Sequence, residues 1–260
     1  MTGGLFQRAI VRPPAPTFAT GLTTVDLGKP DLPRARMQHA AYCDALERCG
    51  LSLVILPEDP AHPDSTFVED TAILTPKRAI LTRPGAPSRM GEIAAIEPAL
   101  SRVYTKLERI REPGTLDGGD VCEAAGRFLI GISRRTNEEG ARQLASFLEE
   151  EGFPSSAVDI RGVKGILHLQ SGIASIGARR VLAIEALREH AALRGYEIVP
   201  VEPEEAYAAN CILVNGTVLM PVGYPRLEAA LRRLGHEIEA VSMSEFEKMD
   251  GGLSCLSLRC

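Results

Sequence analysis

The sequence predicts an α/β fold in which five similar units close into a propeller-like ring. One observation is that a pattern of strand, tight turn, strand and helix (a ββαβ repeat) recurs along the 260 residues. Another is that the fifth copy is completed only by joining the two ends of the chain. Self-similarity of this kind is typical of repeat architectures, and closing a ring of sheets removes exposed strand edges. No linker rich in proline, glycine and serine divides the chain, so we expect one domain over residues 1–260.

Four of the units follow one another directly in the sequence. Their first strands are predicted at 68–74, 118–122, 172–176 and 208–214. Their second strands are predicted at 78–82, 127–131, 180–184 and 217–220. A helix is expected after each second strand, beginning near Ser88, near Thr136, after residue 184 and at Pro225, where a first-turn proline is tolerated.

The turns and helix starts support this division. Asn215-Gly216 stands between two apolar runs and is a strong hairpin signal. Thr136 followed by Glu139 fits a capping box at the start of a helix. Ser244 fits a second capping box before a short helix near the C-terminus.

The fifth unit draws on both ends of the chain. An N-terminal strand at 6–11, a helix at 33–49 and a strand at 51–56 supply most of it, and a C-terminal strand at 253–258 completes it. This arrangement would fasten the ring, because strands from the two ends would pair in one sheet.

The composition narrows the class of protein. A net charge of −5 argues against sequence-independent binding of nucleic acid. The six cysteines form no C-x-x-C pair and are too sparse for a disulfide scaffold, which favours free thiols in a reducing compartment. The start Met1-Thr2-Gly3-Gly4 does not resemble a signal peptide, and no apolar run reaches membrane-spanning length. We therefore expect a cytoplasmic protein with no membrane partner.

An acidic segment precedes the first strand of one unit. Asp64, Glu69 and Asp70 lie close together around Phe67. In a strand, Phe67 and Glu69 would face one side and Asp70 the other. The segment is either a solvated loop or, because buried acids need a cationic partner, a binding site for a cation.

Three further positions carry reactive groups. Asp117 opens an Asp-Gly-Gly-Asp turn, which alone often reflects only turn geometry. His168 stands between two leucines, where a histidine is often a core residue. Cys255 follows paired glycines, which permit positive φ and close approach of a substrate, although a small apolar residue in a strand is the alternative. Because Asp70, Asp117 and His168 occupy matching places in their repeats, we expect them to converge with Cys255 at the centre of the ring.

Two arginines stand at helix starts. Arg89 follows Ser88, and Arg135 precedes Thr136. Exposed arginines are mostly solvated, but a helix N-terminus already favours anions and an arginine adds a bidentate donor. A substrate carboxylate would suit both.

At these residues the chain closely resembles the dimethylarginine dimethylaminohydrolases, a family of the guanidine-modifying (pentein) superfamily. The resemblance covers essentially the whole chain. It rests on the joint order of segments 21–23, 27–31, 67–70, 82–86 with Arg89, 116–120, 135–137, 167–169, 208–211 and 249–255.

The resemblance implies a five-bladed α/β propeller that hydrolyses asymmetric dimethylarginine and monomethylarginine to citrulline and an alkylamine. It implies that Cys255 is the nucleophile, His168 the general acid and base, and Asp117 an acidic residue beside the histidine. It also implies a set of substrate contacts: Glu69 and Asp70 near the guanidinium, Arg89 and Arg135 at the carboxylate, Asp64 at the α-amino group, Phe67, and the backbones of Leu22 and Met249. Leu22 lies in a glycine-containing loop suited to a lid.

The implied chemistry needs no cofactor and no catalytic metal, although zinc could inhibit by binding the thiol and the histidine. The expected partner is a small methylated arginine, and the protein is expected to be a monomer or a homodimer. Two alternatives stay open. One is an arginine deiminase-like hydrolase with the same machinery, and the other is a propeller that binds without catalysis.

Overall fold

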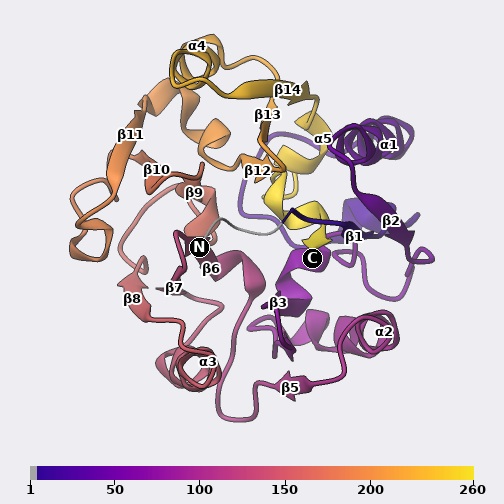
Figure 1. The fold of residues 1–260 in the computed structure, drawn as a ribbon. Helices are drawn as coiled ribbons and strands as arrows, with labels where there is room; N and C mark the ends of the chain where they lie inside the picture. The colour runs from indigo at the N-terminus through magenta and orange to yellow at the C-terminus, as the bar shows by residue number, and fades with distance from the viewer. Residues whose placement is uncertain (1–4) are drawn as a thin grey trace.

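Five three-stranded sheets form the β-structure of residues 5–260, the part of the chain that the computed structural model describes. In every sheet the middle strand pairs antiparallel with one neighbour and parallel with the other. The sheets stand as blades around a common centre, with the long helices at the rim (Figure 1). The chain is thus the five-bladed α/β propeller that the repeats predict. The expectation that the N-terminus is not a signal peptide rests on residues Met1–Gly4, which lie outside the described part.

The blades have the strand orders β3-β4-β5, β6-β7-β8, β9-β10-β11, β12-β13-β14 and β15-β1-β2. The strands are β1 (Arg8–Val11), β2 (Ser52–Ile55), β3 (Ala72–Leu74), β4 (Ala79–Leu81), β5 (Leu107–Arg109), β6 (Val121–Ala124), β7 (Arg127–Ile132), β8 (Ser155–Asp159), β9 (Ile173–Ser175), β10 (Arg180–Ile184), β11 (Glu197–Val201), β12 (Ile212–Val214), β13 (Thr217–Pro221), β14 (Glu237–Val241) and β15 (Leu258–Arg259).

Helices connect the middle strand of a blade to its parallel outer strand, as parallel pairing requires a crossover. The α-helices are α1 (Leu32–Arg48), α2 (Ile93–Leu100), α3 (Glu138–Glu149), α4 (Pro225–Arg233) and the short α5 (Ser244–Glu247). The blade of β9 to β11 departs from the prediction, because its crossover holds only the 3₁₀-helix η6 (Ala191–Leu193) and no α-helix. The other four crossovers carry α1 to α4, as expected.

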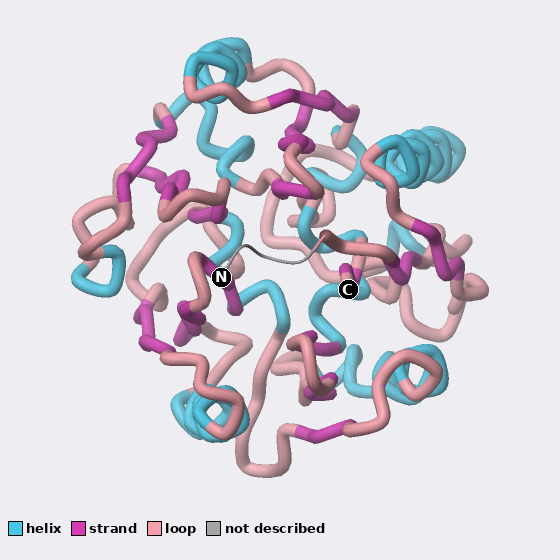
Figure 2. The backbone as a smooth tube through the Cα atoms, in the orientation of Figure 1, coloured by secondary structure: helices cyan, strands magenta, loops and turns pink. Residues whose placement is uncertain are grey.

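A short 3₁₀-helix leads into the innermost strand of every blade. These segments are η2 (Val68–Thr71), η4 (Gly118–Asp120), η5 (Leu169–Ser171), η7 (Pro203–Ala209) and η8 (Ser254–Leu256). They replace the starts of the strands predicted from 68, 118 and 208 and most of the strand predicted at 253–258. Figure 2 shows short helical segments in the interior of the ring and longer helices outside it. The remaining 3₁₀-helices are η1 (Phe18–Thr20) and η3 (Pro87–Glu92).

The ring is closed by strands from both ends of the chain, as predicted. In this blade β1 pairs antiparallel with β15, with Ile10 opposite Leu258, and parallel with β2. A neighbouring blade adds a second fastening, because the side chain of Asn215 accepts from the backbone N–H of Phe6 (2.8 Å) and donates to its carbonyl (2.9 Å). Asn215 and Gly216 both have positive φ, as a two-residue hairpin turn requires.

Two predicted helix caps are wrong in detail. Asn137, not Thr136, caps α3, because its side chain accepts from the N–H of Gly140. Thr136 is buried and its hydroxyl instead accepts from the N–H of Asp117 at 3.1 Å. Ser244 is the first residue of α5 and makes no capping bond. In both cases a polar side chain near a helix start is used for tertiary contact, which sequence spacing does not reveal.

The apolar core lies between neighbouring blades and under their helices. One cluster, for example, joins Ile80 of β4 to Ile130 of β7 and Leu144 of α3. Such packing makes each blade depend on the next, so the 3₁₀-helices at the centre are held from several sides. None of the helices between residues 5 and 260 combines the length and apolar character that crossing a membrane needs.

Candidate active site

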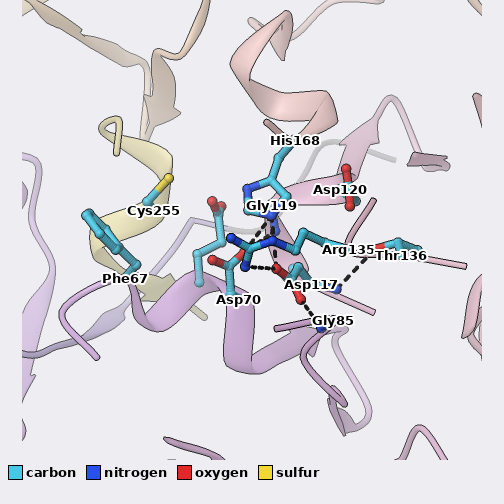
Figure 3. A network of polar contacts seen from close by, with 12 residues as sticks. Phe67, Asp70, Gly85, Asp117, Gly119, Asp120, Arg135, Thr136, His168 and Cys255 are labelled. Atoms are coloured by element: carbon cyan, nitrogen blue, oxygen red, sulfur yellow. Dashed lines mark hydrogen bonds and ion pairs between the residues drawn. The ribbon is translucent and has the colours of Figure 1, made fainter. Parts of the chain in front are cut away.

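The inner 3₁₀-helices meet at the centre of the ring, where η2 contacts η8 and η4, and η5 contacts η4 and η7. A pocket opens at this point. Every residue predicted for the site lines it except Glu69 and Asp117, which lie behind its wall. The convergence inferred from the repeats is therefore present, and Cys255 and His168 face the same space (Figure 3).

The reactive residues were expected at matching positions of their repeats, but the structure places them at two different positions. Asp117 and His168 each stand directly before the first residue of a 3₁₀-helix, η4 and η5. Asp70 and Cys255 instead lie inside η2 and η8, one residue before the last residue of each helix. Two structural positions, each used twice, therefore supply the four reactive groups.

Cys255 lies in η8 and is 8% exposed. The glycines before it serve close packing rather than positive φ. A Cβ on Gly251 would lie 2.3 Å from the ring of Phe67, and one on Gly252 would lie 2.4 Å from the side chain of Asn210. The residue with positive φ is Asp250, at +57°. Close packing at both glycines thus fixes the turn before Cys255, which lines the pocket.

The surroundings of Cys255 favour the neutral thiol in the free protein. Burial, and then the negative charges of Glu69 and Asp70, raise the pKa of the thiol to about 12. A bound cation would act in the opposite direction, because it would compensate the two carboxylates.

Alkylation with iodoacetamide should report this thiol. We expect the part of the reaction that is absent in Cys255→Ser to be slow at pH 7 and to rise about tenfold per pH unit up to pH 9, since only the thiolate reacts. The difference between the two proteins removes the signal of the half-buried Cys43, Cys49 and Cys260. A rate that is already constant at pH 7 would show a thiolate in the free protein.

His168 is held by a carboxylate. Its Nε2 lies 3.0 Å from Oδ2 of Asp117, and 4.0 Å from Oδ1 of Asp70 (Figure 3). Burial lowers the pKa of His168, but the charges of Asp70, Asp117 and Asp120 outweigh it and raise the pKa to about 9. The imidazole is therefore protonated at neutral pH and can give up a proton.

Asp117 is fully buried, and a hydrogen bond from a backbone N–H orients its side chain. Its Oδ1 accepts from the N–H of Gly85 at 2.8 Å, and its Oδ2 lies 3.4 Å from Nη1 of Arg135. Asp117 therefore supports His168 from behind and does not line the pocket. Asp120 supports the same histidine, because its Oδ1 accepts from the N–H of Leu169 at 3.0 Å.

Asp70 presents an ionised carboxylate. Its Oδ1 accepts from the N–H of Gly119 at 2.8 Å, and its Oδ2 accepts from Nη1 of Arg89 at 2.5 Å. Burial raises the pKa of Asp70, but the charges of His168 and Arg89 outweigh burial and lower the pKa to about 2. This buried acid therefore has the cationic partners that the sequence argument required.

Glu69 points away from the pocket, beneath the Cys255 turn. One of its oxygens accepts from the hydroxyl of Ser254 at 2.7 Å and the other from the amide of Gln170 at 3.1 Å. Arg259 lies 3.5 Å away as well. Because both of its oxygens are engaged, Glu69 affects the site through its negative charge, which raises the pKa of the Cys255 thiol.

The two arginines predicted at helix starts differ in burial. Arg89 is 4% exposed and deep in an ion-pair network, whereas Arg135 is half-buried at the pocket edge. Of the two, Arg135 has the freer guanidinium, because within residues 5–260 its polar side-chain contact is the one to Asp117 at 3.4 Å.

The predicted lid is tied to the pocket wall. The N–H of Leu22 donates to both oxygens of Asp64, at 3.0 and 3.2 Å. The N–H and hydroxyl of Thr24 both donate to Asp250, at 2.5 and 3.1 Å. Met249 lies beside Gly21, since a Cβ there would be 3.2 Å from its methyl group. The lid thus touches the segment that carries Cys255.

Among the described residues, Asp70, Asp117 and His168 form a group that could hold a metal ion, with ligand atoms within 4.8 Å of one another. Asp70 already pairs with Arg89, and Asp117 with Arg135. Cation binding there would have to compete with both arginines.

Several residues of the site were not predicted: Leu167, Asp250 and Gly251 line the pocket, and Asp120 and Glu92 support residues that line it. Asp250 belongs to the segment 249–255 but was given no role; its left-handed backbone, its contact with Thr24 and its place in the pocket lining reveal one. Glu92 stands three residues after Arg89, a spacing at which side chains meet on a helix. That spacing was the available signal.

Comparison with known proteins supports this geometry. No family model matches the chain. The chain is 44% identical over 256 residues to the N(G),N(G)-dimethylarginine dimethylaminohydrolase of Pseudomonas aeruginosa, covering 98% of this chain and 100% of that protein. It is 38% identical to the protein of the same name from Streptomyces coelicolor, covering 97% and 96%.

Solved structures agree. A cysteine-to-serine variant of the Pseudomonas aeruginosa enzyme, complexed with citrulline, matches with a TM-score of 0.95 and 43% identity over 99% of this chain and 100% of that one. A histidine-to-glycine variant, an adduct with S-methyl-L-thiocitrulline, also matches with a TM-score of 0.95, at 44% identity over 98% and 100%. The N-terminal domain of ArgZ, a cyanobacterial arginine dihydrolase, shares the fold alone, at 16% identity and a TM-score of 0.87 over 98% and 97%. This chain therefore belongs to the dimethylarginine dimethylaminohydrolase family.

Proposed function

We propose that the protein hydrolyses N-omega,N-omega-dimethyl-L-arginine to L-citrulline and dimethylamine, and N-omega-methyl-L-arginine to L-citrulline and methylamine. The observation that carries this proposal is the meeting of Cys255, His168 and Asp70 in one pocket, in a chain 44% identical to an enzyme of that name. Relatives solved with citrulline and as a thiocitrulline adduct support the substrate class and a covalent intermediate.

The charges of the pocket suit an amino acid with a cationic side chain. Asp70 faces the guanidinium end, and Asp64 together with the backbones of Leu22 and Met249 would hold the α-amino group. Arg135 would bind the α-carboxylate, whereas Arg89 is engaged by Asp70 and Glu92. The ring of Phe67, packed against Gly251, would cover the alkyl chain.

The bound substrate prepares the nucleophile. In the free protein, burial and then the charges of Glu69 and Asp70 raise the pKa of the thiol to about 12. The substrate guanidinium compensates the two carboxylates, which lowers that pKa and releases a proton to solvent. The reactive pair is then the Cys255 thiolate and the His168 imidazolium.

The reaction follows in two stages. Sγ of Cys255 attacks the guanidinium carbon and forms a C–S bond, and His168 protonates the leaving dimethylamine as the C–N bond breaks. A thiouronium adduct remains. The neutral His168 then takes a proton from water as the oxygen adds to the same carbon. The C–S bond breaks and the remaining hydroxyl proton passes to solvent, where dimethylamine takes one up, which gives citrulline and restores thiolate and imidazolium.

A substrate panel tests the proposal. We expect dimethylamine and citrulline from asymmetric dimethylarginine, methylamine from monomethylarginine, and much slower release of ammonia from arginine. The amines are measured by chromatography and citrulline by colorimetry, with Cys255→Ser as the blank. Ammonia from plain arginine as the dominant product would instead make the protein an arginine deiminase-like enzyme.

A further inference from the structure

Glu92 ends the 3₁₀-helix η3 and does not line the pocket. Its side chain is nevertheless almost fully buried, at 1% exposure. Burial raises the pKa of its carboxyl, and Arg89 opposes that shift. A charged group in such a place is costly unless a cation compensates it, so its partner shows what it does.

The partner is the guanidinium of Arg89, from which both carboxylate oxygens of Glu92 accept hydrogen bonds. Nε of Arg89 donates to Oε1 at 2.9 Å, and Nη2 donates to Oε2 at 2.8 Å. This is the bidentate fork that fixes the plane of a guanidinium. Arg89 therefore cannot turn while Glu92 holds it.

The opposite side of the same guanidinium faces Asp70. Nη1 of Arg89 donates to Oδ2 of Asp70 at 2.5 Å, while Nη2 also donates to the carbonyl of Phe67 at 3.1 Å. The plane set by Glu92 thus sets the position of the carboxylate that faces a substrate cation.

The charge balance of this row of three residues has a further consequence. Glu92 and Asp70 each carry one negative charge, and Arg89 between them carries one positive charge. The positive charge of Arg89 is therefore shared, and the row keeps one net negative charge at the pocket. Without the charge of Glu92, Arg89 would neutralise Asp70 and weaken its attraction for a cation.

We propose that Glu92 is a positioning residue: it holds Arg89 from behind and compensates its charge, which leaves Asp70 oriented and negative toward the substrate guanidinium. This inference rests on the proposed function, because Asp70 is taken as the guanidinium contact. It concerns a residue that touches no substrate.

Glu92→Gln tests the inference, because it keeps the size of the side chain and removes the charge. The Michaelis constant for cationic dimethylarginine should rise about tenfold or more, as expected for loss of a charge-assisted contact. The inhibition constant of citrulline, whose ureido group is neutral, should stay within about twofold. A purely structural role would weaken both ligands alike.

The matched control is Glu97→Gln, five residues further along. Glu97 is partly exposed on α2 and pairs with Arg109 at the surface, so its loss should change neither constant. Glu92→Asp keeps the charge but shortens the reach, so it should raise the Michaelis constant less than Glu92→Gln. If Glu92→Gln does not fold, Glu92→Asp carries the test alone, since it too should affect the cation more than citrulline.

Equal weakening of dimethylarginine and citrulline, or no change in either, would overturn the role of Glu92. Failure of the proposed function looks different, since the unmodified protein would then release no dimethylamine from dimethylarginine at all.

Discussion

Replacing Cys255 with serine is expected to lower turnover of dimethylarginine by about 10⁴-fold or more, because serine lacks the nucleophilicity of a thiolate and no neighbouring thiol can replace it. Cys255 is 8% exposed, and serine fills nearly the same space, so the fold should survive. Citrulline formation measures the loss, and thermal unfolding checks the fold. Unchanged activity in this variant would refute the nucleophile.

Cys122→Ser is the matched control. Cys122 is also buried, at 4% exposure in β6, but does not line the pocket. Its replacement should leave turnover as in the unmodified protein, even if the melting temperature falls. The intact mass of protein quenched during turnover should show an added thiouronium group that is absent from Cys255→Ser.

Replacing His168 with glutamine is expected to lower turnover by about 10³-fold, since one imidazole serves both as acid and as base. The amide of glutamine can still bond to Asp117 but cannot exchange a proton at these pH values. Substrate binding should be less affected than turnover, because Asp70 and Arg135 remain in place. Steady-state kinetics separates the two effects.

The protonation state of His168 also predicts how the activity depends on pH. His168 must be charged to protonate the leaving amine, and its pKa is raised to about 9. The activity of the unmodified protein that depends on the imidazolium should therefore persist below pH 9 and decline as the pH rises through it. The residual activity of His168→Gln should lack this decline. His39→Gln, at another buried histidine outside the pocket, should keep both rate and profile; a similar loss there would assign the effect to folding.

The ring was predictable because its signals are local. Asn215-Gly216 requires a turn wherever it stands between apolar runs, and the same order of strand, turn and strand recurs in four places. Joining the chain ends followed from counting strands, and β1 pairs with β15 as expected. The missing helix between β10 and β11 was not predictable, since its segment has the length of a crossover but packs as loop and η6.

The ends of the inner strands show why local pattern falls short. Residues 68–71 and 254–256 contain apolar residues compatible with a strand, yet both form 3₁₀-helices. Their conformation is selected by contacts with other blades, such as Ser254 with Glu69 across the centre. Propensity is a weak guide where tertiary packing decides.

The amino-acid sequence by itself determined the repeating blades, the closure by both ends and the identity of the reactive groups, because these depend on residue type and local order. Only the tertiary structure decided which charges meet. That Asp117 supports His168, that Glu69 lies beneath the thiol and that Glu92 holds Arg89 against Asp70 depend on distances across the ring. Electrostatic effects on pKa and binding vary with those distances and with burial, and neither quantity is contained in the spacing of residues along the chain.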